Sequence, residues 1–292
     1  MCPKLLHRAG AERHAQDGRA RLRATVARMA AQLLEAEQVR IDDAGVPVVD
    51  GLTLATTGEH VLILGAPRAL FEAASGVRDV AHGALRVRGE SARDALRATH
   101  VAGAPLDPAI PQAWTARKYV TWSARLCGHA RASAAGLAKD AIDRMRITSL
   151  ADAPLARATP QMRRGIVIAA ALATGAPVIT LEDPLVELPE EQARALARVI
   201  SEALADRAWL VFAARMPLSS PLALEADEAL VVSRAAVAAQ GAPSELAARE
   251  HAYALRSPGQ HHVRSSARSA DARQMGTCGS RQGDAFHSRT HA

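Results

Sequence analysis

Four short runs of apolar residues most restrict the fold that this chain can adopt. They are Val61–Leu64, Pro177–Leu181, Trp209–Ala213 and Ala229–Val232. Each is bounded and mostly apolar, without polar alternation, which is typical of a strand buried on both faces. Helical patterns lie between the runs, among them Gln161–Leu172 and residues 190–205. Buried strands that alternate with helices predict an α/β fold with a parallel sheet.

Two further regions add to this plan. From Gln38 to Leu54 the apolar residues alternate and are interrupted by Asp-Asp and Gly, which predicts a small antiparallel sheet. Gly83–Val87 is expected to be another strand. Residues 105–172 are expected to be mostly helical, with helices at Thr115–Cys127, capped by Thr115 and closed by Gly128, at Leu137–Met145 and at Gln161–Leu172.

Composition and charge narrow the function classes. The 292 residues are 49% hydrophobic, enough for a sizeable core. The net charge of +6 is concentrated at the ends, with +4 in residues 1–36 and +4 in 256–292, so that 37–255 carries −2. A nucleic-acid-binding fold usually has its basic surface on the folded body, so no nucleic-acid partner is expected. Three widely spaced cysteines fit a reducing cytoplasm and predict neither a disulfide framework nor a zinc site.

We expect three regions along the chain. Residues 1–36 form a basic, disordered extension, 37–255 the folded domain with a helical subdomain at about 105–172, and 256–292 a disordered polar tail. The histidines of that tail are unevenly spaced, and no metal site is expected. No apolar run reaches the length of a membrane span, so the chain is expected to be soluble or held at a membrane by a partner.

The order of several segments resembles the nucleotide-binding subunit of an ABC transporter over about residues 37–250. The segment Val48–Leu54 followed by Gly58-Glu59 resembles the approach to that family's phosphate loop. Met162-Arg163-Arg164 and Leu181–Pro184 resemble its signature and acidic segments, and Ala226–Val232 followed by Ala239–Leu246 resembles its C-terminal strand, turn and helix. No single piece is specific, but their order and spacing together are.

The resemblance implies a P-loop NTPase-like parallel sheet with a small antiparallel β subdomain and an inserted α-helical subdomain. It implies ATP and Mg²⁺ as cofactors. It also implies two partners, an integral-membrane permease and a second nucleotide-binding subunit in a homo- or heterodimer. The expected location is cytoplasmic, peripheral on the inner face of the cell membrane.

The phosphate loop is the first place where the chain departs from that family. A working loop needs G-x-x-x-x-G-K-[ST], whose amides, lysine and hydroxyl hold the phosphates and Mg²⁺. Here Gly65 is followed by Ala66-Pro67-Arg68, so the loop is about four residues short and lacks the second glycine, the lysine and the hydroxyl. The three lysines (Lys4, Lys118 and Lys139) all lie elsewhere. Gly65 and Arg68 are the remaining candidates for phosphate binding.

The other functional positions also differ. The acidic pair is Glu182-Asp183, the reverse of the family's order, which misplaces each carboxylate by about one methylene. Thr159 keeps a hydroxyl where the signature has serine, with helix capping as the alternative role. At the position of the family's glutamine in the loop that joins the subdomains, this chain has Leu106. Pro189 stands in place of the aspartate that follows the acidic pair, and Ala214 stands in place of the switch histidine. The segment Asp42–Gly45 offers no aromatic residue to stack on adenine.

These departures favour a degenerate ATP-binding subunit that docks on a membrane permease and lacks ATP hydrolysis on its own. Two alternatives stay open. One is an active ATPase with an atypical site built on Arg68, Glu182, Asp183 and Thr159. The other is a soluble regulatory or scaffold protein derived from the same fold.

Three of the eight aromatic residues, Trp114, Tyr119 and Trp122, lie in one predicted helical stretch. In the family that the chain resembles, this subdomain receives the membrane subunit. The cluster is therefore either a docking surface or ordinary core packing.

Overall fold

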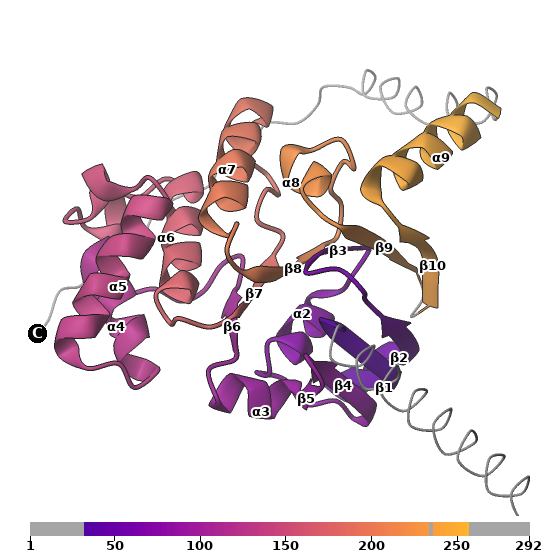
Figure 1. Ribbon diagram of the computed structural model, residues 1–292, viewed down its shortest axis with the longest axis horizontal. Coiled ribbons are helices and arrows are strands. Elements are labelled where there is room, and N and C mark those ends of the chain that lie inside the picture. Colours follow the sequence, from indigo (N-terminus) through magenta and orange to yellow (C-terminus); the bar gives the residue numbers. More distant parts are fainter. Residues whose placement is uncertain (1–31, 234–235, 257–292) are drawn as a thin grey trace, which may run out of the picture. The chain divides into compact units, whose positions relative to one another are not determined.

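Strands and helices alternate along the described part of the chain. The computed structural model describes residues 32–233 and 236–256 (Figure 1). The strands are β1 Leu34–Asp43, β2 Val46–Ala55, β3 His60–Leu64, β4 His82–Val87, β5 Glu90–Ser91, β6 Val101–Ala104, β7 Val178–Glu182, β8 Ala208–Ala213, β9 Glu228–Ser233 and β10 Ala236–Gly241. The helices are α2 Arg68–Ala74, α3 Ala92–Arg97, α4 Ala116–Leu126, α5 Arg131–Arg144, α6 Pro160–Leu172, α7 Glu190–Ala203, α8 Pro221–Leu224 and α9 Pro243–Arg256, with 3₁₀ turns at Thr148–Leu150 and Leu155–Arg157.

Six strands form the central sheet, in the order β10-β9-β3-β8-β7-β6. All neighbours are parallel except β10, which pairs antiparallel with β9. The four apolar runs of the sequence are β3, β7, β8 and β9, so the predicted parallel sheet is confirmed. Each of these runs is almost completely buried.

Successive residues of these strands point into two different cores, because side chains alternate across a strand. Leu62, Ile179 and Val211 belong to the core on the side of α4–α7. Ile63 and Leu210 belong to the core formed with α2 and the antiparallel sheet. Strands β3, β7, β8 and β9 thus form the middle layer of the fold, whereas the edge strand β10 has side chains that are exposed or only partly buried.

The antiparallel sheet has the order β2-β1-β4-β5 and confirms the small sheet predicted from the alternation (Figure 1). Its first hairpin turns at Ala44 and Gly45, both with positive φ (49° and 82°), a conformation that suits the twist of two-residue hairpins.

Helices α4, α5 and α6 pack together at one end of the fold, within the segment expected to be helical (Figure 1). Thr115 caps α4 by accepting the Lys118 N–H, and Gly128 follows the helix with φ 87°, as predicted. Helix α6 begins at Pro160, beside the predicted start. The predicted second helix was too short, since α5 begins at Arg131 and not at Leu137.

The boundaries of the folded part differ slightly from the prediction. Strand β1 begins at Leu34, inside the segment expected to be disordered, and α9 continues to Arg256. Strands β6 and β10 were not predicted. The rest of both predicted tails, 1–31 and 257–292, lies outside the described residues.

Two acidic side chains hold the turn between β2 and β3. Glu228, 8% exposed, accepts the Thr57 and Gly58 N–H groups at 2.7 and 3.3 Å. Asp227 accepts the N–H groups of Glu59 and His60 at 3.0 and 2.9 Å. These carboxylates thereby fix where β3 enters the sheet. Among the described residues, no helix has the length and hydropathy needed to cross a bilayer.

The layered packing predicts unequal effects of two truncations. Ile63→Ala removes a fully buried side chain from the core beneath α2 and should lower the free energy of unfolding by about 3 kcal/mol. Val46→Ala, at a side chain 63% exposed, should change it by less than about 0.5 kcal/mol. Urea denaturation of the two variants measures both values, and equal losses would contradict this assignment of the core.

Candidate functional site

Four loops meet at one edge of the parallel sheet, because the carboxyl ends of parallel strands lie together. Gly65 follows β3, Ala214 follows β8, Glu182 ends β7, and Leu106 lies two residues after β6. The strand order β3-β8-β7-β6 makes these four positions neighbours along the edge. This edge is therefore the candidate site, and it brings together most of the positions singled out in the sequence.

The loop after β3 is very short. Gly65, Ala66 and Pro67 alone join β3 to the seven-residue helix α2. Gly65 has φ 72°, and a Cβ there would lie 2.3 Å from the carbonyl oxygen of Val232, so this position requires glycine. Its N–H donates to the Ala213 carbonyl at 2.9 Å, and Pro67 has no N–H. Two of the three loop residues therefore have no amide available for a phosphate.

Arg68 is held by carboxylates of its own chain. Its Nε donates to Glu72 Oε1 at 2.9 Å and lies 3.6 Å from Glu182 Oε1. The second oxygen of Glu72 accepts from Arg78 Nε at 2.6 Å, and Arg78 lies 3.3 Å from Asp43 Oδ1. Alternating charges thus connect the end of β7 to the first hairpin of the antiparallel sheet.

The two arginines change the titration of the acid between them. Burial alone would raise the pKa of Glu72, but the hydrogen bonds from Arg68 and Arg78, together with their charges, lower this pKa below its ordinary value. Glu72 is therefore favoured as the anion in the folded chain.

Glu182 is buried, with 6% of its surface exposed. Its Oε2 accepts the Leu106 N–H at 3.0 Å, while Oε1 faces Arg68. A buried carboxylate needs partners of this kind. One oxygen accepts a backbone N–H and the other lies at ion-pair distance from Arg68, and the side chain ties the loop after β6 to the end of β7.

Asp183 makes the equivalent link to the loop after β8. Its Oδ1 accepts the Ala214 N–H at 3.0 Å, and its own N–H donates to the Phe212 carbonyl at 2.8 Å. Burial raises the pKa of Asp183; the Ala214 N–H and the Arg164 charge oppose this rise, and the Glu182 charge adds to it. Asp183 also has φ 39°, a conformation that Asp and Asn tolerate better than most residues.

Arg164 is a second cation near the acids, and the sequence analysis did not assign it a role. It lies on α6, is 9% exposed, and donates to the Pro184 carbonyl at 3.5 Å. Burial lowers the pKa of Arg164, and the charges of Glu187, Asp183 and Asp107 partly offset this. The sequence did contain a signal for this role. Arg164 stands directly before a long apolar run in a predicted helix, which indicates that its side chain can be buried.

Thr159 caps α6. Its hydroxyl accepts the Met162 N–H at 3.4 Å, and Pro160 occupies the first helical position, where its missing N–H has no cost. Within the described residues, no hydrogen bond or ion pair links Thr159 to Arg68 or to the acidic pair. The geometry therefore supports helix capping, which the sequence analysis gave as the alternative role of Thr159.

Comparisons with known proteins address the fold. No family model and no curated protein sequence matches the chain. Among solved structures, cbiO1 from Clostridium perfringens, described as part of the ABC transporter complex cbiONQ, superposes with a TM-score of 0.65 at 17% identity, over 78% of this chain and 96% of that one. MJ1267, an ATP-binding cassette of an ABC transporter in its ADP conformation, gives a TM-score of 0.62 at 12% identity, over 77% and 98%. A bacterial Atm1-family ABC exporter with ATP bound gives 0.59 at 19% identity, over 78% of this chain and 42% of that chain.

The chain has the fold of an ATP-binding cassette.

The other residues that the sequence analysis matched to functional positions of the family lie at the same edge or near it. Ala214 and its neighbour Arg215 are exposed at the switch position, and neither side chain can shuttle a proton as histidine does. Pro189 caps α7. Leu106 contributes its backbone N–H to Glu182 and no side-chain amide.

A cassette would be expected to hold ATP and Mg²⁺ at this edge, and the residues present do not fit them. The chain lacks the lysine and hydroxyl of a phosphate loop, and both oxygens of Glu182 already have partners. One oxygen of Asp183 accepts the Ala214 N–H. Among the described residues, no cluster of three His, Cys, Asp or Glu side chains is arranged to hold a metal ion.

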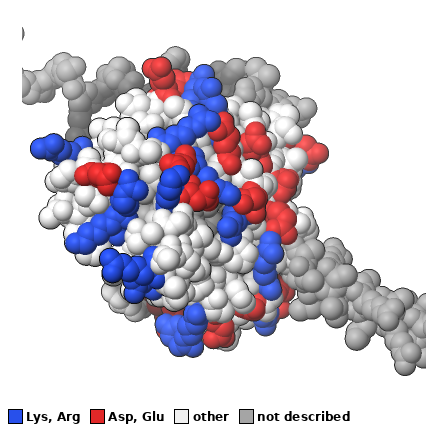
Figure 2. Space-filling view, turned by 60° about the vertical axis from the view of Figure 1, so that its left-hand side comes forward, with Lys and Arg blue, Asp and Glu red and all other residues white. Residues whose placement is uncertain are grey.

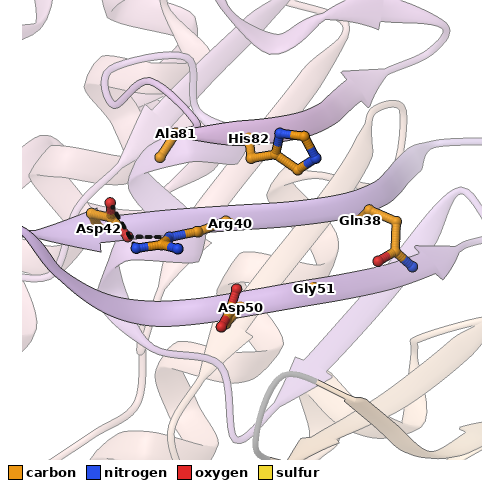
Figure 3. A pocket seen from close by; sticks show the side chains of 7 residues that line it. All are labelled: Gln38, Arg40, Asp42, Asp50, Gly51, Ala81 and His82. Atoms are coloured by element: carbon orange, nitrogen blue, oxygen red, sulfur yellow. Dashed lines mark hydrogen bonds and ion pairs between the residues drawn. The ribbon is translucent and has the colours of Figure 1, made fainter.

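A hollow of about 420 Å³ lies on the antiparallel sheet of the cassette (Figure 3). It is lined by Gln38, Arg40, Asp42, Asp50, Gly51, Ala81 and His82. Arg40 Nε donates to Asp42 Oδ1, two residues further along β1, at 2.8 Å. No Phe, Tyr or Trp lines the hollow, so it provides no stacking surface for adenine, and it shares no residue with the acidic edge.

The lowered pKa of Glu72 predicts a pH-dependent effect of Glu72→Gln. The ionised form stabilises the folded chain above the unfolded-state pKa of about 4.3, and this contribution is lost as the pH falls through the lower folded-state pKa. At pH 7 the variant should lose on the order of 1 kcal/mol of unfolding free energy, and the difference should shrink below about pH 4. Urea denaturation from pH 7 to 3.5 measures this. The matched control is Glu191→Gln, at an exposed carboxylate; an equal loss there would contradict the network.

Asp183→Asn should change the free energy of unfolding in the opposite direction. A raised folded-state pKa means that ionised Asp183 destabilises the fold, with the penalty absent at low pH and present as the pH rises through that pKa. Asparagine keeps the acceptor for the Ala214 N–H and tolerates the positive φ. The variant should therefore be more stable than the parent at pH 7, by on the order of 1 kcal/mol, with a gain that vanishes in acid. Thermal unfolding at several pH values tests this against Asp50→Asn, an exposed control; a loss of stability at pH 7 would refute it.

Proposed function

We propose that the chain is a degenerate ATP-binding subunit of an ABC transporter, without ATP hydrolysis of its own. It would dock on a membrane permease from the cytoplasmic side and be peripheral to the membrane. The cassette fold supports the subunit assignment. The structural neighbour cbiO1, which is matched over 96% of its own length, is described as part of a transporter complex. The degeneracy rests on the site.

One observation carries the proposal. Glu182, the buried acid at the end of β7, has one oxygen on the Leu106 N–H and the other beside Arg68. In a competent cassette the acidic pair faces a hydrated Mg²⁺ and an attacking water. Here a guanidinium of the chain itself neutralises the carboxylate, so the charge balance needs no metal ion.

The shortened loop supports the same conclusion independently. Phosphate binding by a loop depends on several amides converging on one anion. Gly65 donates its amide to β8 and Pro67 has none, while Arg68 is engaged by Glu72 and Glu182. A triphosphate would have to break these internal pairs before gaining any contact.

Such a subunit would depend on others for turnover. We propose that it pairs with a second nucleotide-binding subunit, either another copy or a catalytically competent one, and that the competent subunit supplies hydrolysis. The fold and its docking surfaces would then be what this chain contributes.

Isothermal titration calorimetry with ATP up to millimolar concentration, with and without Mg²⁺, tests the proposal directly. We expect no saturable heat in either case and phosphate release no faster than that of Glu182→Gln. Both measurements use the full chain.

Two outcomes would favour an atypical active ATPase. The first is saturable ATP binding that weakens in Arg68→Ala but not in Arg198→Ala, a control at an exposed arginine of α7. The second is Mg²⁺-dependent hydrolysis that Glu182→Gln abolishes. Either result would refute the degenerate assignment.

A further inference from the structure

The antiparallel sheet contains a bulge that crosses three of its strands. Gln38 in β1, Gly51 in β2 and Gly83 in β4 have positive φ angles of 49°, 77° and 83°. The pairing register of β1 shifts at this point against both β2 and β4. A Cβ on Gly83 would lie 2.4 Å from the Gln38 carbonyl oxygen, so the bulge requires glycine there. A non-glycine residue such as Gln38 is uncommon in this conformation, and outliers of this kind concentrate where proteins bind ligands.

The bulge holds a hydrogen-bond acceptor at the hollow on this sheet (Figure 3). Gln38 and Gly51 both line the hollow of about 420 Å³. The Gln38 amide is oriented by Thr53, since its Nε2 donates to Thr53 Oγ1 at 2.9 Å. Its Oε1 then lies over Gly51, where a Cβ would be 3.8 Å away. Within residues 32–233 and 236–249, no group donates a hydrogen bond to this oxygen.

Asp50 supplies a second free acceptor in the hollow. In Figure 3, Asp50 on β2 and His82 on β4 lie on either side of Arg40 on β1. The hydrogen bond to Asp42 raises the pKa of Arg40, and the charge of Asp50 adds to this rise. Arg40 is thus within electrostatic reach of Asp50 but gives its hydrogen bond to Asp42. Asp50 forms no ion pair or hydrogen bond with any other residue of the described ranges.

An acid without a basic partner is unusual on this sheet. Glu35 and Glu37 lie 3.5 and 3.3 Å from Arg86, and Asp42 lies 2.8 Å from Arg40. Figure 2 shows the same tendency on another face, where acidic side chains adjoin basic ones over its centre. The carboxylate of Asp50 is therefore available to a cation from outside the described residues.

The lining of the hollow selects a cation with several N–H groups. Arg40 and Asp42 cancel each other's charge, so Asp50 leaves the lining with a net charge of −1 when His82 is counted as neutral. The unfilled positions are the two carboxylate oxygens of Asp50 and Oε1 of Gln38. A guanidinium group matches them, because two of its N–H groups can pair with one carboxylate while others remain for a further acceptor.

We propose that this hollow binds a guanidinium group, which donates two N–H groups to Asp50 and another to Gln38 Oε1. The site goes beyond the proposed function, since it involves neither the acidic edge nor a nucleotide. The group can belong to a small guanidino compound or to an arginine side chain. Residues 1–31 of this chain contain six arginines, so the test includes them as a source.

Three probes that differ only in their polar group test the proposal on the ¹⁵N-labelled full chain. They are butylguanidinium, butylammonium and butylurea, which separate the planar cation from a compact cation and from a neutral group of similar shape. The Gly51 backbone amide and the Gln38 side-chain amide report on the hollow. The Gly128 amide, which follows α4, is the remote control.

We expect butylguanidinium to shift the Gly51 and Gln38 signals saturably in the millimolar range and to leave Gly128 unchanged. Asp50→Asn should weaken binding about tenfold, because it removes the charge that pairs with the guanidinium. Gln38→Asn should weaken it about threefold, since asparagine tolerates the positive φ but withdraws the amide by one methylene. The matched control Glu191→Gln, at an exposed carboxylate of α7, should change it less than about twofold.

A further variant distinguishes the two sources of the guanidinium group. In it, glutamine replaces all six arginines of residues 1–31, which are Arg8, Arg13, Arg19, Arg21, Arg23 and Arg28. Tighter binding of butylguanidinium than in the parent chain would show that one of these arginines competes for the hollow. An unchanged affinity would assign the hollow to a guanidino compound from outside the chain.

Four results would overturn the proposal. They are no saturable shift of the Gly51 and Gln38 signals, equal binding of butylurea, equal binding of butylammonium, or an unchanged affinity in Asp50→Asn. Asp50 has no hydrogen bond or ion pair within the described residues, so this variant changes the ligand's partner without removing an internal contact. The titration contains no nucleotide, and its failure would leave the calorimetric test of degeneracy unaffected.

Discussion

Burial of the parallel sheet on both faces is the constraint on which the rest of the fold depends. Side chains such as Leu62 and Ile63 alternate between two cores, so both the helical layer and the antiparallel sheet are held through the same strands. Continuous apolar strands can be satisfied only when both faces are covered. Their carboxyl ends must then lie along one edge, and the loops that follow them meet there whether or not a ligand binds. The position of the candidate site is a consequence of the sheet.

That edge also poses an electrostatic problem. Two adjacent acids, Glu182 and Asp183, end a buried strand, and buried carboxylates without partners are unfavourable. In a nucleotide-binding cassette, Mg²⁺ and a lysine can balance such charges. In this chain Arg68 and the more deeply buried Arg164 lie close enough to influence the acids, and the amides of Leu106 and Ala214 supply hydrogen bonds. Only three residues separate β3 from α2, and the arginine that begins α2 lies 3.6 Å from Glu182.

The sequence was sufficient for features that depend on local pattern. The run Val61–Leu64 predicts a buried strand, which β3 confirms, and the short segment Gly65–Pro67 that joins it to α2 follows from the sequence as well. It was insufficient where the cause is tertiary. Strand β6 reads Val-Ala-Gly-Ala and has little apolar signal of its own; space is tight at Gly103, where a Cβ would lie 3.0 Å from Ser75 Oγ. The acceptor roles of Glu182 and Asp183 depend on amides 76 and 31 residues away, which no spacing rule connects.

The acidic pair is retained for a reason that does not require catalysis. At the opposite end of the sheet, Asp227 and Glu228 use their carboxylates to hold the backbone amides of the turn that enters β3. Glu182 and Asp183 do the same for the loops after β6 and β8. Removing such a carboxylate leaves a backbone amide without this acceptor, a loss of about 0.5–1.5 kcal/mol that acts on stability. An acid at this position of the fold can therefore act as a loop anchor, and its presence by itself does not indicate hydrolysis.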